Sequence, residues 1–468
     1  MNELTIPLDV HRKMPLYEQI YRYICREIKD GRMRAGEKLP SSRALALYLQ
    51  VSRSTVDLAY SQLLSEGYIH SVPCKGYYIC EIEALYDLPM EKARSRIRRP
   101  EKETYRYDFA LSGIEEDGFP FSTWNRLMKE ALLDTERRMF RQGEPAGEWG
   151  LREALADYLR HARGVDCTPE QIVVGAGNDY LLMLLSVILG RRDRAVAMEN
   201  PTYPSAWRCF KSLGYDVRTV GMDRLGMSVE ELENTGANVA YVMPSHQFPT
   251  GMIMPVSRRM QLLGWAARGK DRYIIEDDYD SEFRYKGKPI PALQGSDGGG
   301  RVIYLGTFSK SIAPSIRISY MALPDRLLDA YAGRGACFAT TVSRVDQRVM
   351  ERFLREGYFE RHLNRMRGIY KSKHDALVNS LRQNRIPCRI FGEHAGVHLM
   401  LRLENGMGEE EARRRAAGSG IRVYGLSEYL RPDSRGACEP ALLLGYAGMN
   451  CGEIERAVEL LARAWVRT

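Results

Sequence analysis

Apolar residues recur at helical spacing over the first eighty positions of the chain. Leu16, Ile20, Ile24 and Ile28 stand four residues apart, so they predict one face of an amphipathic helix that ends near Gly31. Serines precede two later apolar patterns and suit helix N-caps, because a serine oxygen accepts a hydrogen bond from a free backbone N–H. These two patterns predict helices whose inward-facing residues are Leu45 and Leu49, and Val56, Tyr60, Leu63 and Leu64.

Two short alternating segments, 67–70 and 76–79, follow the third predicted helix, with Pro73 and Lys75 between them. Such alternation over a few positions is typical of paired strands in a hairpin. Three helices followed by a basic hairpin predict a winged helix-turn-helix, to which we assign residues 1–80.

Farther along, short apolar runs alternate with helical patterns and predict a mainly parallel sheet from Ile172 to about Leu323. Ligands of such sheets bind at the carboxyl ends of the strands. From about Tyr370 the chain is expected to form a smaller subdomain that includes a strand over 396–401. The runs that predict buried strands of the large sheet are 172–174, 195–198, 273–275 and 302–306.

Residues 81–104 separate the two regions and lack sustained apolar periodicity. Basic residues between Lys92 and Arg99 are flanked by acids, which is typical of a solvated linker. A secondary contact with DNA phosphates is the alternative. The expected organisation is a small domain over 1–80, a linker over 81–104 and a large domain over 105–468.

The composition agrees with two domains. A chain of 468 residues exceeds what one hydrophobic core usually organises, and 44% hydrophobic with 27% charged residues is ordinary for a globular protein. The net charge of +8 permits nucleic-acid binding without establishing it. Nine cysteines without a C-x-x-C pair indicate free thiols in a reducing compartment and predict no metal site.

No membrane contact is expected. The first residues lack the basic start and apolar core of a signal peptide, and the longest apolar run, Tyr180 to Leu189, is too short to span a bilayer. We therefore expect a cytoplasmic protein.

The segment 307–317 carries the strongest chemical signal. It follows a predicted buried strand and places Lys310 seven positions before Arg317, with Thr307 and Ser309 close by. A lysine at a strand end can form an imine with an aldehyde, and an arginine with hydroxyls can hold a phosphate. Both needs are met by one ligand, pyridoxal phosphate (PLP).

A second signal lies at 276–280, directly after the predicted strand 273–275. A carboxylate here, Asp277, can pair with a protonated pyridine nitrogen, and Tyr279 can bond the ring's phenolic oxygen. The alternative is an acidic loop that is solvated or binds a cation. The lysine motif favours the cofactor interpretation.

From about Tyr105 to Thr468 the chain resembles the fold-type I, aspartate-aminotransferase-like enzymes, and residues 10 to 80 resemble the GntR-type winged helix-turn-helix. Joined in this order, the two parts resemble the MocR/GabR-type transcriptional regulators. The phrases at 244–251 and 276–283 look especially like that subfamily.

The resemblance implies further cofactor residues. Tyr203 would stack on the pyridine ring, although it can also be a turn tyrosine that packs against Trp207. A small-residue turn between a strand and a helix suits phosphate, because helix N-terminal amides bind anions. The expected phosphate amides there are those of Ala176, Gly177 and Asn178.

Two departures from the aminotransferases bear on mechanism. Where those enzymes place an asparagine before Pro-x-Gly this chain has Phe248, and Gln247 is the expected substitute contact to the ring's phenolic oxygen. The arginine that holds a substrate carboxylate near the C-terminus is replaced by leucine in the segment 441–446. Arg431 is the expected substitute and Arg422 a weaker candidate. The loss argues against efficient amino-acid turnover.

In a winged helix the start of the recognition helix reaches base edges, and the wing touches the DNA backbone or the minor groove. The alternative is a helical dimerisation module with surface arginines. The phrase Leu-Pro-Ser-x-Arg, shared with GntR-type regulators, favours DNA. The expected DNA-binding residues are Arg43, Ser52, Arg53, Thr55, Lys75 and Gly76.

The sequence therefore predicts a PLP-dependent regulator that binds double-stranded promoter DNA and senses an amine, an amino acid or PLP itself. The resemblance also implies a homodimer. One alternative is a working aminotransferase with an appended DNA-binding domain, and another is a regulator in which PLP is only structural.

Overall fold

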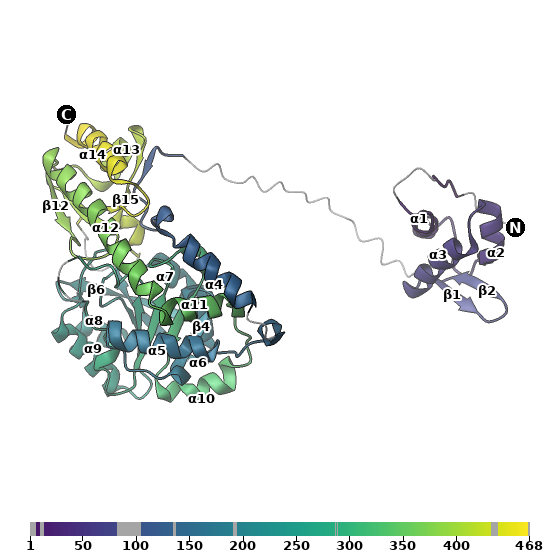
Figure 1. Cartoon of the computed structure of the whole chain (residues 1–468), viewed down its shortest axis with the longest axis horizontal. Helices are drawn as coiled ribbons and strands as arrows, with labels where there is room; N and C mark the ends of the chain where they lie inside the picture. The colour runs from purple at the N-terminus through teal and green to yellow at the C-terminus, as the bar shows by residue number, and fades with distance from the viewer. Residues whose placement is uncertain are drawn as a thin grey trace. The chain divides into compact units, whose positions relative to one another are not determined.

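The computed structural model describes residues 6–9, 14–81, 104–133, 137–190, 194–285, 287, 289–431 and 439–466. The chain divides into two compact units, Met1–Glu101 and Lys102–Thr468, each described here by itself (Figure 1). The interior of the predicted linker, residues 82–103, lies outside the described residues.

The first unit contains three helices and one hairpin, as the sequence predicts. The elements are α1 (Leu16–Lys29), α2 (Ser42–Leu49), α3 (Arg53–Ser65), β1 (Ile69–Val72) and β2 (Gly76–Ile79). The strands pair antiparallel, with Ile69 opposite Ile79.

Both predicted serine caps of this unit are confirmed. Ser41 Oγ accepts a hydrogen bond from the amide of Ala44, and Ser52 Oγ accepts one from the amide of Thr55, each at 3.2 Å. Each cap satisfies an N–H that has no partner within its helix. The helices pack on one apolar core, whose most deeply buried members include Ile20, Ile24, Val56, Tyr60 and Leu63.

The second unit is built on an eight-stranded sheet with the order β4-β11-β10-β9-β8-β5-β6-β7. The contiguous strands β6, β5, β8, β9 and β10 run parallel, which confirms the predicted parallel sheet. Strand β11 is antiparallel to both of its neighbours, which the sequence did not indicate. The strands are β4 (Ile172–Gly175), β5 (Ala195–Asn200), β6 (Asp216–Asp223), β7 (Gly226–Met227), β8 (Val239–Val242), β9 (Tyr273–Asp278), β10 (Val302–Thr307) and β11 (Ser319–Ala322).

Helices cover both faces of this sheet (Figure 1). Alternate residues of β5 enter different cores: Val196 and Met198 join one, and Ala195 and Ala197 join the other. Burial on both faces explains why the strands are continuously apolar in sequence. The helices of this part are α4 (Phe121–Leu133), α5 (Trp149–Arg163), α6 (Asn178–Leu189), α7 (Pro204–Ser212), α8 (Val229–Thr235), α9 (Val256–Arg268), α10 (Leu328–Ala330) and α11 (Arg344–Arg355).

The predicted smaller C-terminal subdomain is present as a four-stranded antiparallel sheet, β12-β13-β16-β15, with helices. An N-terminal segment also joins it, because β3 (Tyr107–Asp108) pairs with β14 (Ile421–Arg422). None of the described helices is long and apolar enough to cross a membrane. The remaining elements are α12 (Tyr358–Gln383), β12 (Cys388–Phe391), β13 (His398–Leu403), α13 (Glu409–Gly418), β15 (Tyr424–Gly425), β16 (Leu442–Gly445) and α14 (Cys451–Val466).

Candidate functional site

Four adjacent strands, β4, β11, β10 and β9, bring distant parts of the sequence together. Thr307 at the end of β10 pairs with Ser319 on β11, and Ser319 pairs with Gly175 at the end of β4. Across β10, Gly306 pairs with Asp278 at the end of β9. The motifs that follow β4, β9 and β10 therefore meet at one edge of the sheet, where open α/β sheets bind ligands.

Three hydroxyl groups cluster after β10. Ser319 Oγ donates to Thr307 Oγ1 at 2.8 Å, and Thr307 Oγ1 donates to Ser309 Oγ at 3.0 Å. The amide of Ser309 also donates to Thr307 Oγ1, at 3.2 Å. The two predicted hydroxyls thus lie together, and Ser319 is an additional member that its position in the sequence did not reveal.

Arg317 reaches across to the turn before α6. Its Nη2 donates to the carbonyl of Ala176 at 3.0 Å and lies 3.6 Å from a carboxylate oxygen of Asp179. A Cβ on Gly177 would stand 2.2 Å from this Nη2, and the φ of Gly177 is +92°. Only glycine therefore leaves room for the guanidinium over the start of α6, next to the predicted phosphate amides.

The amide of Ala176 donates to Thr341 Oγ1 at 2.9 Å. One predicted phosphate donor, the amide of Ala176, thus already has a partner. The side chain of Asn178 makes a hydrogen bond to the neighbouring carboxylate of Asp277. Its Nδ2 donates to Asp277 Oδ1 at 3.1 Å.

Asp277 is buried and held from two sides, by Asn178 and by the hydroxyl of Tyr241, which donates to Oδ2. Burial raises the pKa of Asp277 to about 7, and the nearby charges of Asp278 and Asp280 add to the rise. A cation placed beside Asp277 would be strongly favoured, because it would stabilise the ionised carboxylate.

Tyr279 belongs to a buried polar group behind the strand ends. Its hydroxyl lies 3.0 Å from His246 Nδ1, which in turn lies 3.0 Å from both carboxylate oxygens of Asp280. A Cβ on Gly396 would stand 2.1 Å from His246 Cε1, so the imidazole fills the space that this glycine leaves. His246 was not singled out from the sequence.

The Lys310 amine donates to the carbonyl of Leu111 at 2.7 Å. Burial lowers its pKa to about 8, while the charge of Asp280 acts in the opposite direction. A larger fraction of this amine is therefore neutral near neutral pH than for a solvated lysine, as a nucleophile requires.

Tyr203 presents its ring next to Phe248, with ring centroids 5.5 Å apart and an edge-on angle of 85°. Phe248 also contacts Tyr279 and Tyr429 edge-on. Tyr203 remains 37% exposed, so part of its side chain is accessible to a ligand. This arrangement suits stacking on a flat ring.

Gln247, expected to contact a ring oxygen, makes hydrogen bonds to two loops. Its Nε2 donates to the carbonyl of Pro201 at 2.9 Å, and its Oε1 accepts hydrogen bonds from the amide and hydroxyl of Thr250. This buried amide thus connects two loops, and its contact with a ring oxygen stays a prediction. A sequence pattern cannot separate the two roles, because they differ only in the direction of the side chain.

Arg431 lies against Trp207, with its guanidinium carbon 5.1 Å from the ring centroid. Its Nε and Nη2 are buried and make no hydrogen bond with any residue that the structure describes. Burial lowers its pKa, and the like charge of Arg208 acts in the same direction. Its backbone is fixed by two hydrogen bonds with the Asn200 side chain, at 3.0 and 3.3 Å.

A buried ion pair lies beneath the site and was not predicted. Arg163 Nε stands 2.8 Å from Asp278 Oδ2, and the same oxygen accepts a hydrogen bond from Tyr304 at 2.5 Å. Arg163 also donates to Ser245 Oγ at 2.9 Å. The pair joins α5 to β9, so it holds the segment that carries Asp277. These residues are far apart in sequence and share no recognisable spacing.

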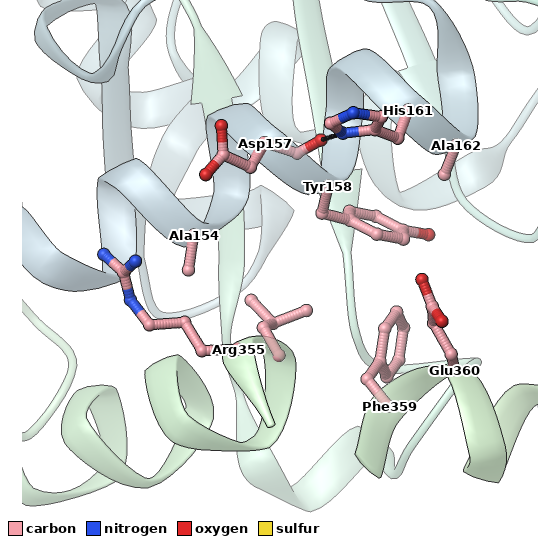
Figure 2. A pocket seen from close by; sticks show the side chains of 9 residues that line it. Ala154, Asp157, Tyr158, His161, Ala162, Arg355, Phe359 and Glu360 are labelled. Atoms are coloured by element: carbon pink, nitrogen blue, oxygen red, sulfur yellow. Dashed lines mark hydrogen bonds between the residues drawn. The ribbon is translucent and has the colours of Figure 1, made fainter. Parts of the chain in front are cut away.

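A cavity of about 450 Å³ lies between α5 and the helices α11 and α12. Figure 2 shows that His161 Nδ1 turns back to the carbonyl of Asp157, 2.7 Å away on the same helix. Arg355, at its edge, pairs with Glu153. The cavity contains none of the predicted site residues, and we place the candidate site at the strand ends instead.

In the first unit, the predicted DNA-binding residues lie on α2, at the start of α3 and at the hairpin tip. Arg43 and Arg53 are exposed. Ser52 forms the cap of α3, and its Oγ also lies 2.7 Å from Thr55 Oγ1. Both hydroxyls are therefore used within the cap.

Lys75 and Gly76 lie at the tip of the β1–β2 hairpin. Gly76 has a φ of +109°, and a Cβ there would come within 3.3 Å of Lys38 Cε. The turn thus requires glycine, which keeps the backbone at the tip uncovered.

Comparison with known families matches both units. The sequence model of "Aminotransferase class I and II" matches residues 117–461, and that of "Bacterial regulatory proteins, gntR family" matches residues 16–79. Among solved structures, an archaeal alanine:glyoxylate aminotransferase is similar with a TM-score of 0.69 and 26% identity, over 79% of this chain and 92% of that one.

Whole-length relatives combine the two parts in the same way. The chain is 37% identical to the uncharacterized HTH-type transcriptional regulator YdeL of Bacillus subtilis, over 99% of both chains. It is 33% identical to the probable rhizopine catabolism regulatory protein MocR of Rhizobium meliloti, over 98% of this chain and 95% of that one. It is 32% identical to the pyridoxine biosynthesis regulator PdxR of Corynebacterium glutamicum, over 81% and 82%.

Proposed function

We propose that this chain, which belongs to the MocR-type transcriptional regulators with a GntR-type helix-turn-helix and an aminotransferase class I and II domain, binds PLP and senses a small amine or amino acid at that site. One observation carries the proposal. Asp277 and Tyr279 lie at the end of β9, and Lys310 and Arg317 lie between β10 and β11, so two segments distant in sequence come together at one edge of the sheet.

The residues present fit PLP. Arg317 lies over the start of α6 in the space left by Gly177, and Thr307 and Ser309 supply hydroxyls beside it. Together they offer charge and hydrogen bonds to a phosphate dianion. At the other end, Asp277 suits a protonated ring nitrogen, because that cation would offset the cost of burying the carboxylate.

When bound, PLP supplies an aldehyde that bonds amines covalently and a ring that withdraws electrons. Three side chains of the chain suit this chemistry. Lys310 presents an amine whose pKa is lowered to about 8. The Tyr279 hydroxyl is held 3.0 Å from His246 Nδ1, and the Tyr203 side chain stays partly exposed.

The sensed molecule is proposed to carry a carboxylate as well as an amine. Arg431 supports this, because its buried Nε and Nη2 have no acceptor within the described part of the chain and would gain most from an anion. The Trp207 ring, 5.1 Å from the guanidinium carbon, limits the positions that the guanidinium can take. An arginine fixed in this way can bind a carboxylate with two parallel hydrogen bonds.

The whole-length relatives favour regulation over catalysis, since those cited are transcriptional regulators. The segment expected to carry an aminotransferase's carboxylate arginine is instead β16, whose leucines 442–444 are buried in the subdomain core. We therefore expect slow or no sustained turnover. Incubation with PLP, an amino donor and a 2-oxo acid tests this, and turnover at ordinary enzyme rates would favour the enzyme alternative.

We further propose that the protein acts as a homodimer on double-stranded promoter DNA. Arg43 and Arg53 would contact bases or phosphates, Lys75 would contact phosphate, and Gly76 would allow the hairpin to approach closely. Ser52 and Thr55 would act by fixing the start of α3. A dimer on two half-sites predicts an operator with a repeated element in phase with the DNA turn.

Chemical trapping tests the cofactor assignment. Borohydride reduction of the PLP-treated, full-length protein should attach the cofactor permanently to the peptide that contains Lys310, as located by mass spectrometry. Lys310→Ala should abolish the label, whereas Lys129→Ala, which alters an exposed lysine on α4, should retain it. Label on another lysine in the wild type would overturn the assignment.

A further inference from the structure

The solvent-facing side of α3 has a distinctive composition. Its exposed side chains within about 60° of one another around the helix axis are Ser54, Leu58, Ser61 and Ser65. Leu58 is 57% exposed and is the large apolar residue among three serines. The opposite face, with Val56 and the residues that pack near it, enters the core. Leu58 therefore has no part in stabilising the fold through that core.

At the N-terminal end of α3, Arg53 Nε lies 3.4 Å from Asp57 Oδ2, one helical turn away. The Arg53 side chain is 68% exposed, so this ion pair orients a guanidinium that is open to a partner. A carboxylate on such a surface would repel DNA phosphates if it acted alone. Paired with Arg53, the Asp57 carboxylate instead fixes the plane of the guanidinium. The forked donors of that guanidinium match O6 and N7 of guanine.

The nearby hydroxyls are already occupied. Ser52 Oγ lies 2.7 Å from Thr55 Oγ1 and 2.9 Å from Ser54 Oγ, in addition to capping the helix. These groups set the position of the helix start. Within α3, discrimination between bases is left to Arg53 and Leu58.

We propose that α3 selects DNA through a guanine contact of Arg53, oriented by Asp57, and an apolar contact of Leu58 with a thymine methyl group in the major groove. The inference rests on the proposed function, because it requires α3 to be the helix that enters the groove. The thymine methyl is the apolar group on the major-groove base edges, and it matches the one large apolar side chain of this face.

The positions of the two side chains on α3 separate the bases that they would contact. Leu58 follows Arg53 by five residues, which is about 7.5 Å along the helix axis and about 140° around it. The two side chains therefore leave α3 in different directions. A preferred half-site should contain both a guanine and a thymine, at separate base pairs.

Site selection followed by removal of a single methyl tests the proposal. The full-length protein would be used to enrich duplexes from a random pool, and the thymine of the resulting site would then be replaced by deoxyuridine. Wild-type affinity should fall about fourfold, the worth of one buried methyl or methylene group. Leu58→Ala should bind both duplexes equally. Leu47→Ala, which alters an 83% exposed leucine on α2, should keep the wild-type sensitivity.

The guanine contact has its own test. Replacing guanine by 7-deazaguanine removes the N7 acceptor and should weaken wild-type binding by roughly tenfold or more. Asp57→Asn should reduce that loss, because the guanidinium is then less well oriented.

The outcomes separate the inference from the function on which it rests. If no duplex is enriched, DNA binding itself fails and the inference fails with it. If duplexes are enriched but wild type and Leu58→Ala respond alike to deoxyuridine, only the inference is overturned. A Leu58→Ala variant that changes oligomeric state and leaves base preference intact would also overturn it.

Discussion

His246 and Asp280 form a buried pair in which Nδ1 lies 3.0 Å from each carboxylate oxygen. The same Nδ1 lies 3.0 Å from the Tyr279 hydroxyl. The pair therefore links the loop after β8 to the loop after β9 and fixes the hydroxyl proposed to face the cofactor. Asp280 also acts on the charge of Lys310, so one carboxylate influences two proposed cofactor contacts.

Asp280→Asn should separate these two effects. Loss of the carboxylate leaves His246 without its charged partner, and we expect the free energy of unfolding to fall by about 1–3 kcal/mol. Because Asp280 raises the pKa of Lys310, its removal should also move the pH midpoint of PLP attachment downward. Denaturant unfolding and a pH series of the cofactor's visible absorption measure the two. An unchanged midpoint would contradict the electrostatic link.

Attachment of PLP to the wild type should itself depend on pH around 8. The neutral Lys310 amine is the reactive form, and its pKa is lowered to about 8 by burial, so the attachment rate should rise with pH and level off above that value. Stopped-flow absorption at a series of pH values measures the rate. A rate that keeps rising toward the pKa of an ordinary lysine would show that the amine is not desolvated.

Gly177→Ala should displace Arg317, since the new Cβ would stand 2.2 Å from Nη2 and the φ of +92° disfavours alanine. PLP affinity should fall by roughly tenfold, the effect of about 1.4 kcal/mol of lost phosphate contact. Equilibrium titration with PLP measures this change.

Gly368→Ala is the matched control. Gly368 lies within α12, where an added Cβ meets nothing within 4 Å. This variant should keep wild-type PLP affinity and gain about 0.5–1 kcal/mol of stability, because alanine is the better helix former. Equal loss of PLP affinity in both variants would exclude the proposed role of Gly177, which is to leave room for the Arg317 guanidinium.

Arg431→Gln should leave PLP binding intact and abolish the response to effectors that carry a carboxylate. Arg431→Lys should fail to restore it, because an ammonium cannot form the two parallel hydrogen bonds of a guanidinium. A spectral screen of amines with and without a carboxylate group distinguishes these outcomes. If the variant discriminates between the two classes as the wild type does, another residue reads the carboxylate.

The sequence alone indicates candidate site residues where their position follows from a neighbouring predicted strand. Lys310 and Asp277 could be proposed because each lies near the carboxyl end of a buried strand, and the carboxyl ends of parallel strands lie at one edge of a sheet. Tyr241 could not, since its contact with Asp277 depends on β8 being the neighbour of β9. Strand order is decided by packing across the whole domain.

The role of a polar side chain was harder to predict than its position. Gln247 lies in the expected loop, yet its amide is used by Pro201 and Thr250. The Asn178 side chain, whose contribution the sequence left open, supports Asp277. Each outcome follows from which neighbouring backbone or side-chain group comes within about 3 Å, and no spacing in the sequence encodes that.

The central claim is that covalent capture of PLP at Lys310 lets small amines alter DNA affinity. Operator binding by the full-length protein, measured with and without PLP and across an amine panel, tests it most directly. The account predicts that at least one amine shifts wild-type affinity by about tenfold, or 1.4 kcal/mol, and that Lys310→Ala shows no shift. An identical response in wild type and Lys310→Ala would contradict it.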